Sequence, residues 1–295
     1  MDPFIEAEKA QGHSVARCCV LFEVSRAAYY QRCRAVPSAR ALADRVLSTT
    51  IRAIHAESNG TYGSPRIQHQ LRARGTRCGR RRVARLMRQA GLEGCHQRRW
   101  RTTTVHDPAT RGADLDLIQR AFEPGQDQGR RYCGDITYVA TWEGWAYLAT
   151  VIDLDSRRVA GWSVADHLRT ELVTDALKVA FAQHRPGPGA IFHSDRGCQY
   201  TSAEFRQFAQ DYGVRLSLSR TGDCFDNAVA ESFFATLKRE LIHRQAWPTR
   251  AGLRQALFDY IEGWYNTRRL HSSLNYRSPA AYEAALHGRT RQQAA

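Results

Sequence analysis

The hydrophobic residues of this chain follow two different periods. In roughly the first hundred residues, apolar side chains recur every three or four positions, which predicts amphipathic helices. From Arg131 onward apolar and polar residues alternate in 131–141, 145–156 and 157–165, which predicts three strands. The turn sequence WEGW joins the first two strands as a hairpin, and the third continues the meander. We therefore expect a helical front followed by an α/β body.

After this meander, helical and strand-like patterns alternate. The expected elements are a helix around Leu172–Phe181, a short buried strand at 190–195, a helix opened by a capping box of Thr201 and Glu204, a strand at 214–219 and a helix from Ala230 to Leu241. The order β-β-β-α-β-α-β-α is that of a ribonuclease-H-like fold. It predicts an α/β core with a mixed five-stranded sheet, its first three strands antiparallel, and helices on both faces.

The helical front is expected to consist of small all-α segments. HSVARCCVLF and SRAAYYQRC give two short helices that resemble a helix-turn-helix. In a second pair, Ser64 and Pro65 begin a helix that Gly75 ends, and GRRRVARLMRQAGL forms its partner. The expected domains are a helix-turn-helix-like segment (1–36), an arginine-rich helical domain (45–105), a linker (106–128), the ribonuclease-H-like core (129–245) and a C-terminal helical tail (246–295).

The front is strongly basic, whereas the body is nearly neutral. Residues 1–105 carry 20 basic and 7 acidic side chains, a net charge of +13, and residues 106–295 carry 23 and 22. Such an asymmetry favours a polyanion partner that binds mainly to the front. A solvated charged face is the alternative, but faces of that kind usually mix both signs.

Arginines dominate the second helical pair. Between positions 66 and 101 the chain has twelve arginines, no lysine and one acid, Glu93. Arginine suits bidentate contacts with phosphate and guanine, so we predict that this region binds the phosphate groups of its partner. The residues expected to contact it are Arg66 and a stripe formed by Arg81, Arg85 and Arg88.

No segment resembles a signal peptide or a membrane span, so we expect a cytoplasmic, nucleoid-associated protein with no membrane partner. The eight cysteines include no C-x-x-C pair and are not accompanied by H-x₃₋₅-H. We therefore expect no zinc site. Disulfides are rare in the cytosol, and we interpret the cysteines as buried thiols.

Three carboxylates are candidates for a metal site. Asp135 lies within the first strand, Asp195 ends the fourth strand, and Glu231 lies on the last helix. Because the first and fourth strands are adjacent in this topology, Asp135 and Asp195 should lie side by side, with Glu231 above them. Clustered carboxylates repel one another unless cations are present. Oxygen ligands suit Mg²⁺ or Mn²⁺, and two such ions about 4 Å apart can support phosphoryl transfer.

Each of these acids also has a structural explanation, and the first and third positions have rivals. A strand aspartate can pair with an arginine, an aspartate at a strand end often forms a turn, and a helix glutamate is usually on the surface. Asp153 and Asp155 are the rivals for the first position. Asp223 and Asp226 are the rivals for the third, although Asp226 is better explained as a helix cap.

The helix of Glu231 carries an unusual polar face. Its apolar side is formed by Ala230, Phe233, Phe234, Leu237 and Leu241, and its other side by Asn227, Glu231, Ala235 and Lys238. Two helical turns separate Lys238 from Glu231, so the ammonium lies on the carboxylate's face. We predict that a metal ligand and a phosphate-binding cation meet the same DNA strand here. Glu240, off this line, is expected to tolerate replacement by glutamine.

Several long motifs occur in a fixed order: YGSPRIQHQL, GDITYV, ATVIDLDSRRVAGWSV, FHSDRGCQYTS, SLSRTGDCFDNAVAESFFATLKREL and YIEGWYNTRRLHSSLNYRSPAAYE. Together they resemble the bacterial insertion-sequence transposases of the IS-three type, in particular the product of their second reading frame. That family is related to retroviral integrases through the DDE catalytic core. The resemblance covers nearly the whole chain, although the zinc-binding module of retroviral integrases has no counterpart here.

The resemblance implies a site, a reaction and partners. Asp135, Asp195 and Glu231 would be the catalytic triad and the ligands of two Mg²⁺ or Mn²⁺ ions, with Lys238, beside Asn227, contacting the element ends. Activated water would cut one strand at each end, and the freed 3′-hydroxyl would attack another phosphodiester. The expected partners are double-stranded DNA (the terminal inverted repeats of the element and the target), further copies of the chain in a homo-oligomer, and a first-reading-frame protein. The alternatives are a catalytically silent DNA-binding protein acting as a repressor, and a nuclease of the same fold without strand transfer.

Overall fold

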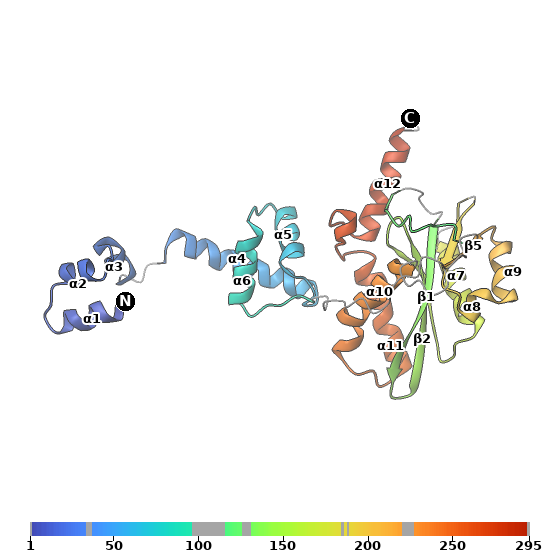
Figure 1. The fold of residues 1–295 in the computed structure, drawn as a ribbon, viewed down its shortest axis with the longest axis horizontal. Coiled ribbons are helices and arrows are strands. Elements are labelled where there is room, and N and C mark those ends of the chain that lie inside the picture. Colours follow the sequence, from blue (N-terminus) through green and yellow to red (C-terminus); the bar gives the residue numbers. More distant parts are fainter. Residues whose placement is uncertain are drawn as a thin grey trace, which may run out of the picture.

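The computed structural model of the protein describes residues 2–33, 37–95, 116–125, 131–183, 186–187, 189–219 and 227–293. A series of helices precedes an α/β unit (Figure 1). The helices of the front are α1 (Asp2–Ala10), α2 (Val15–Leu21), α3 (Arg26–Cys33), α4 (Ala39–Glu57), α5 (Ser64–Ala73) and α6 (Arg80–Gln89). The pattern analysis did not predict α1 or the long helix α4. Within the described ranges, no helix is long and apolar enough to cross a membrane.

The α/β unit is built on one sheet. Its strands are β1 (Arg131–Thr141), β2 (Gly144–Asp153), β3 (Val159–Ala165), β4 (Ile191–Ser194) and β5 (Arg215–Leu218). They lie in the order β3-β2-β1-β4-β5. The pairs β1–β2 and β2–β3 are antiparallel, and β1–β4 and β4–β5 are parallel. This is the mixed ribonuclease-H-like sheet that the pattern predicted.

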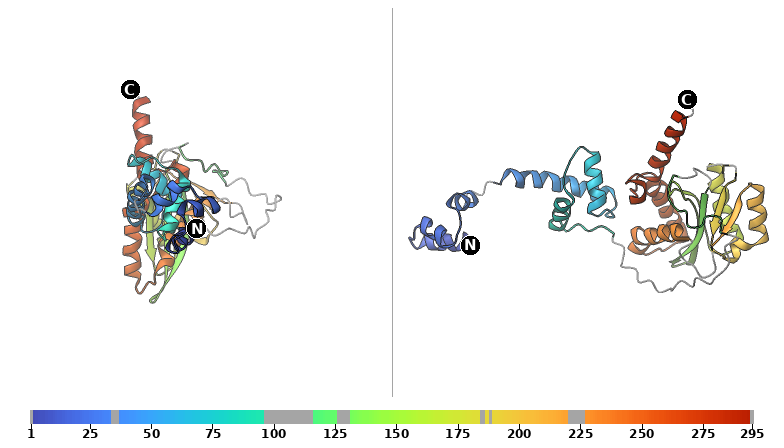
Figure 2. Two further views of the ribbon diagram at one scale, coloured as in Figure 1. Left: turned by 90° about the vertical axis from the view of Figure 1, so that its left-hand side faces the viewer. Right: turned by 45° about the horizontal axis from the view of Figure 1, so that its top comes forward.

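Helices cover both faces of the sheet (Figures 1 and 2). On one face, α7 (Thr170–Gln183), α8 (Cys198–Thr201) and α9 (Ala203–Asp211) bury residues such as Phe181 and Phe205 against Phe192 of β4. The other face carries α10 (Ala228–Glu240), α11 (Arg250–Phe258) and the π-helix η4 (Asp259–Tyr265). A Cβ on Gly161 of β3 would lie 2.3 Å from the Ala176 carbonyl oxygen, so glycine is required where α7 packs on the sheet.

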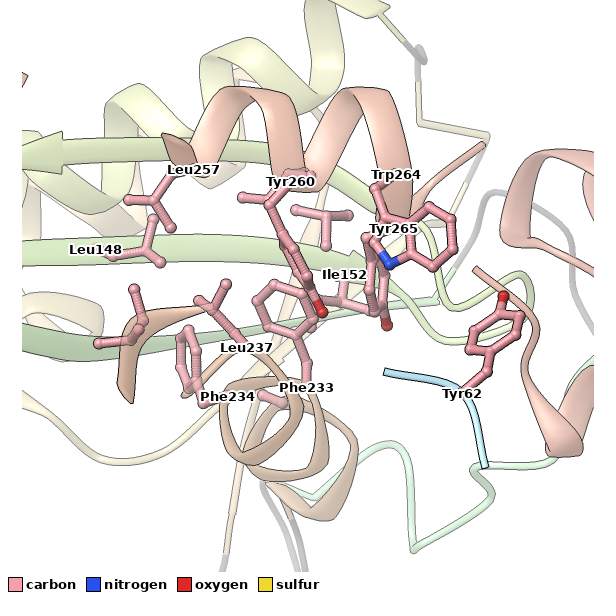
Figure 3. Packing of buried hydrophobic residues seen from close by; sticks show 14 of the residues in the cluster. Tyr62, Leu148, Ile152, Phe233, Phe234, Leu237, Leu257, Tyr260, Trp264 and Tyr265 are labelled. Atoms are coloured by element: carbon pink, nitrogen blue, oxygen red, sulfur yellow. The ribbon is translucent and has the colours of Figure 1, made fainter. Parts of the chain in front are cut away.

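Helix α10 is fixed on its face by its apolar side. Phe233, Phe234 and Leu237 are buried and pack in the same cluster as Leu148 and Ile152 of β2. Figure 3 shows these side chains together with those of η4 above them. Burying each large apolar side chain contributes about 1.5–3 kcal/mol, which holds the opposite, polar side of α10 in a defined orientation.

The C-terminal segment continues this core. It comprises η3 (Ile242–Arg244), α11, η4, η5 (Ser272–Leu274) and α12 (Pro279–Gln293). Asn266, directly after η4, accepts a hydrogen bond from Val159 N and donates one to Val159 O, both at 3.0 Å. The segment is thereby attached to β3, the edge strand of the sheet.

The front contacts the body through Tyr62, which is only 1% exposed. Its ring lies 5.5 Å from that of Trp264, and its hydroxyl oxygen accepts the Leu270 N–H at 2.7 Å (Figure 3). Arg66 donates from Nε to the Leu270 carbonyl at 2.9 Å. The start of α5 therefore rests on the C-terminal segment.

Two details of the pattern analysis were wrong. Helix α9 begins at Ala203 and is capped by Ser202, whose Oγ accepts the Phe205 N–H at 3.1 Å, so Thr201 does not form the expected capping box. The cap lies one residue later because the hydroxyl of Thr201 donates to the turn carbonyl of Gly197. Two cysteines, Cys33 and Cys198, are exposed rather than buried.

Candidate active site

The pairing of β1 with β4 sets the positions of two carboxylates. The last residues paired between these parallel strands are Cys133 and His193, and Asp135 and Asp195 each follow two residues later. Both side chains therefore lie at the same level of the sheet, where β4 ends beside the middle of β1. Gly134, the residue before Asp135, allows the ring of Phe192 on β4 to pack against β1, because a Cβ at position 134 would lie 2.2 Å from that ring.

Short backbone hydrogen bonds orient both aspartates. Asp135 Oδ1 accepts the N–H of the next residue, Ile136, at 2.8 Å. Asp195 Oδ1 accepts the Gly197 N–H at 3.0 Å, where the chain turns from β4 toward α8. Each of these bonds uses one oxygen of the carboxylate.

Glu231 and Lys238 approach the aspartates from α10. Glu231 lies in the first turn and is exposed, and Lys238 lies in the last turn and is half-buried. The Glu231 carboxylate raises the pKa of Asp135 and the Lys238 ammonium lowers it, so the polar side of α10 faces Asp135. Lys238 also lies over the ring of Tyr138, 5.7 Å from its centre, a neighbour that the sequence analysis missed.

The pKa of Asp135 is raised from 3.8 to about 7. Burial is the main cause, and the negative charges of Asp195 and Glu231 add to it, while the Ile136 N–H and the Lys238 ammonium act in the opposite direction. Burial also raises the pKa of Glu231. A site in which negative charge is so disfavoured favours the binding of a cation.

The donor set fits a hard divalent ion, because it consists of carboxylate oxygens. The fit is incomplete in one respect: among the described residues, no three histidine, cysteine, aspartate or glutamate side chains are grouped closely enough to hold one ion together. The residues therefore suit Mg²⁺ or Mn²⁺ by chemistry and by charge rather than by a preformed cage.

The rival acids of β2 have structural partners. Asp153 accepts the N–H groups of Asp155 and Ser156 at 2.8 and 2.7 Å and so closes the turn after β2. Asp155 forms a buried ion pair with Arg131 at 2.5 Å. Neither needs a metal to explain its position. The other rivals, Asp223 and Asp226, lie outside the described residues.

Asn227 lies at the start of α10 and is buried, with 7% of its surface exposed. Its Nδ2 donates to the carbonyl of Gly134 at 3.4 Å, whereas its Oδ1 has no hydrogen-bond partner within the part of the chain that the structure describes. The side chain therefore links α10 to the strand segment that carries Asp135.

The arginines expected to bind DNA differ in their surroundings. Arg81 and Arg88 are exposed on α6. Arg85 forms an ion pair with Asp44 of α4 at 2.6 Å and is half-buried. Arg66 is engaged with the Leu270 carbonyl, as described above. Of the four, Arg81 and Arg88 present their charge most openly to a ligand.

The expectation for Glu240 was wrong, because this residue is buried and ion-paired. Its two carboxylate oxygens accept from Arg269 Nε and Nη2 at 2.9 and 2.8 Å, and the Tyr260 hydroxyl donates to it at 2.9 Å. Burial raises the pKa of Glu240, but the hydrogen bonds and charge of Arg269 outweigh it and hold the pKa below its usual value. No sequence pattern indicated this pair.

Family models match most of the chain. The integrase core domain matches residues 125–224, and a second integrase core model matches 212–279. An HTH-like domain matches residues 41–100, which include α5, α6 and nearly all of α4. Asp135 and Asp195 fall in the first integrase core match, Glu231 falls in the second, and the arginine-bearing helices fall in the HTH-like match.

Relatives at high coverage identify the family. The chain is 39% identical to the transposase for insertion sequence element IS904 of Lactococcus lactis, over 84% of this chain and 97% of the relative. It is 36% identical to transposase InsF for insertion sequence IS3A of Escherichia coli, over 95% and 97%. A solved structure of the HTLV-2 integrase catalytic core in complex with magnesium is similar at 17% identity, covering 52% of this chain and 96% of that one with a TM-score of 0.40. The chain belongs to the family of insertion-sequence transposases, polynucleotidyl transferases with an integrase catalytic core.

Proposed function

We propose that Asp135, Asp195 and Glu231 are the catalytic carboxylates of this transposase, and that they cut and join DNA at the ends of its insertion sequence. The observation that carries the proposal is that Asp135 and Asp195 each follow a paired residue of the adjacent strands β1 and β4, with Glu231 and Lys238 of α10 near enough to affect the pKa of Asp135. Perturbed carboxylates beside a cation are typical of functional sites. The two rival acids of β2, Asp153 and Asp155, are held in a turn and in an ion pair.

The three carboxylates are proposed to hold two Mg²⁺ or Mn²⁺ ions. Ions bound there would activate the attacking oxygen and stabilise the leaving oxygen in phosphoryl transfer. The oxygen-only donors and the raised pKa of Asp135 support this assignment. We expect no zinc requirement.

Protein groups around the carboxylates orient the reactants. The N–H groups of Ile136 and Gly197 each hold one oxygen of an aspartate, which leaves the other available to a ligand. Lys238 is proposed to bind a DNA phosphate beside Asp135, which its ammonium charge near that carboxylate supports. In the first displacement water attacks the phosphorus and the 3′-oxygen leaves. In the second, that 3′-hydroxyl attacks another phosphodiester and displaces its 3′-oxygen.

Recognition of the ends is assigned to the HTH-like domain. Arg81 and Arg88 are exposed on α6 and carry charge suited to phosphate or guanine. We propose these two as the principal contacts, with Arg85 and Arg66 contributing less, because protein groups already engage them. Asn227 is proposed to position α10 at the DNA rather than to read bases.

Joining two element ends requires two active sites, so a homo-oligomer is proposed as the working form. A partner protein from the first reading frame is proposed as a further component. The cytoplasm, at the nucleoid, is the proposed location.

The experiment that tests this function uses duplexes of the element's own ends, with Mg²⁺, with Mn²⁺ or with EDTA. We expect 3′-end nicks and joined products only when a divalent ion is present. Binding without nicks under all conditions would support the repressor alternative. Nicks without joined products would indicate a nuclease.

A further inference from the structure

The tip of the β1–β2 hairpin carries a cluster of exposed aromatic side chains. Tyr138, Trp142 and Trp145 are 60%, 77% and 51% exposed. The rings of Tyr138 and Trp145 are 5.1 Å apart and nearly perpendicular, at 89°. Trp145 pairs with Ala140, and Tyr138 with Tyr147, so the two exposed rings are diagonal neighbours on one side of the hairpin. None of the interactions assigned to the active site uses Trp142 or Trp145.

The hairpin tip is held in place by several hydrogen bonds. The Trp142 N–H donates to the Trp247 carbonyl at 3.0 Å. Arg250 donates from Nε to the Trp145 carbonyl at 3.1 Å and from its backbone N–H to the Glu143 carboxylate at 2.7 Å. These hydrogen bonds fix the backbone that carries the aromatic rings.

Lys238 connects the cluster to the proposed catalytic carboxylates. Tyr138 lies three residues beyond Asp135 on β1, and because successive side chains of a strand alternate, its ring leaves the sheet on the face opposite to the Asp135 carboxylate. Lys238, which acts on the charge of Asp135, lies over the Tyr138 ring at 5.7 Å. A strand whose phosphate meets Lys238 therefore passes next to the Tyr138 ring, which itself contacts Trp145.

The size and charge of the cluster favour a nucleic acid over a protein partner. Three aromatic side chains bury about 450–750 Å² even when fully covered, whereas a stable protein interface buries about 800 Å² on each partner. The cations Lys238 and Arg250 contact the aromatic side chains or their backbone. Rings beside cations are the combination that binds unpaired bases and their phosphates.

We propose that Tyr138, Trp142 and Trp145 form a stacking site for unpaired bases of the DNA strand that adjoins the scissile phosphodiester. The proposal rests on the proposed function, because that function brings a DNA strand to Asp135. Stacking on the hairpin would hold separated bases next to the active site. Duplex DNA, whose bases are already stacked, would gain little from the cluster.

Binding of single-stranded and duplex DNA to the full chain tests this site. The probes are fluorescein-labelled oligothymidine of about 15 nucleotides and a duplex of equal length, measured by fluorescence anisotropy without divalent ions. The double substitution Trp142→Ala and Trp145→Ala leaves the Tyr138–Lys238 contact in place. We expect it to weaken oligothymidine binding roughly tenfold or more and duplex binding less than about twofold.

Two controls make the result specific. Phe258 on α11 is 51% exposed, the same as Trp145, and Phe258→Ala should change neither affinity. Trp145→Phe keeps a ring and should bind oligothymidine nearly as well as the unchanged protein. Equal loss for both probes, or no loss for either, would overturn the proposal. A change in oligomeric state by light scattering with unchanged oligothymidine affinity would also overturn it, and would assign the cluster to a protein interface.

The assay involves no cleavage, so its outcome is independent of the end-nicking experiment. If the protein nicks element ends but shows no preference for single strands, the proposed function is supported and the stacking site is refuted. If it shows that preference but does not nick, the stacking site is supported and the assigned catalytic role is refuted.

Discussion

The two ends of helix α10 carry glutamates in opposite electrostatic situations. Glu240, at the C-terminal end, is 6% exposed and receives hydrogen bonds from Arg269 and Tyr260. Glu231, in the first turn, is exposed and belongs to a group with Asp135 and Asp195. The pKa of Glu240 is lowered, whereas those of Glu231 and Asp135 are raised.

The difference separates a structural carboxylate from candidate metal ligands. A buried carboxylate that has a bidentate arginine partner is neutralised within the fold. Carboxylates that repel one another remain unbalanced until an external cation arrives. On this helix, the charge environment distinguishes the two roles, although residue type does not.

Removing the partner of Glu240 should have the largest effect on stability. Arg269→Ala leaves a buried carboxylate uncompensated and should lower the free energy of unfolding by about 3–5 kcal/mol. Urea unfolding of the metal-free protein measures it. The control is Arg206→Ala on α9, an exposed arginine, which should change stability by less than about 0.5 kcal/mol. If Arg269→Ala cost no more than this control, the contrast between the two ends of α10 would disappear.

Asp135 and Glu240 should contribute to the pH dependence of stability with opposite signs. Asp135 keeps its proton up to about pH 7 in the folded protein but loses it near 3.8 when unfolded. Its ionisation therefore reduces the stability of the metal-free protein as pH rises through this interval. Glu240, with its lowered pKa, stabilises the fold above its ordinary pKa of 4.5, and that contribution is lost as pH falls below it.

The variant Asp135→Asn isolates the first of these effects. It should stabilise the metal-free protein by about 1–2 kcal/mol at pH 8, after allowance for solvent screening, and by progressively less toward pH 4. Urea titrations at several pH values measure the difference. Asp211→Asn, at an exposed position of α9, should show no such trend. A gain that did not depend on pH would mean that repulsion at Asp135 is not its source.

A smaller effect on stability is expected at Tyr62, where the helical front contacts the C-terminal segment that also covers Glu240. Tyr62→Phe keeps the ring against Trp264 but removes the hydroxyl that accepts the Leu270 N–H. The loss of this hydrogen bond should cost about 1 kcal/mol. Thermal unfolding compared with Tyr30→Phe, at an exposed tyrosine, measures it. A variant as stable as the control would show that the hydroxyl does not contribute to the contact.

Short-range patterns were sufficient to predict where the three candidate carboxylates lie in the fold, although their catalytic role stays a prediction. The alternation in β1 and the apolar side of α10 set which way Asp135 and Glu231 face, and the strand order brings Asp195 beside them. The strand order and the packing of α10 thus bring together three candidates that lie far apart in the sequence.

The Glu240 pair was not predictable in this way. Arg269 lies 29 residues from Glu240, beyond a π-helix that no periodicity indicated. The apolar and polar sides of α10 suggested a surface position, but the C-terminal segment covers it. Burial by a distant segment, rather than local pattern, decides the role of Glu240. The same holds for Arg66, whose hydrogen bond to Leu270 joins residues far apart in the sequence.

The central claim is that Glu231 belongs to the reacting centre, and the nicking rate of Glu231→Gln tests it most directly. The substitution keeps the shape of the side chain and removes one negative charge, so nicking of element-end DNA in Mn²⁺ should fall by at least ~10³-fold. Binding of that DNA should change by less than about threefold, because the arginine-rich front supplies most of the affinity. Glu204→Gln, at an exposed site on α9, should nick normally. A Glu231→Gln protein that nicks within about tenfold of the unchanged protein, too small a loss for a transition-state contact, would contradict the assignment.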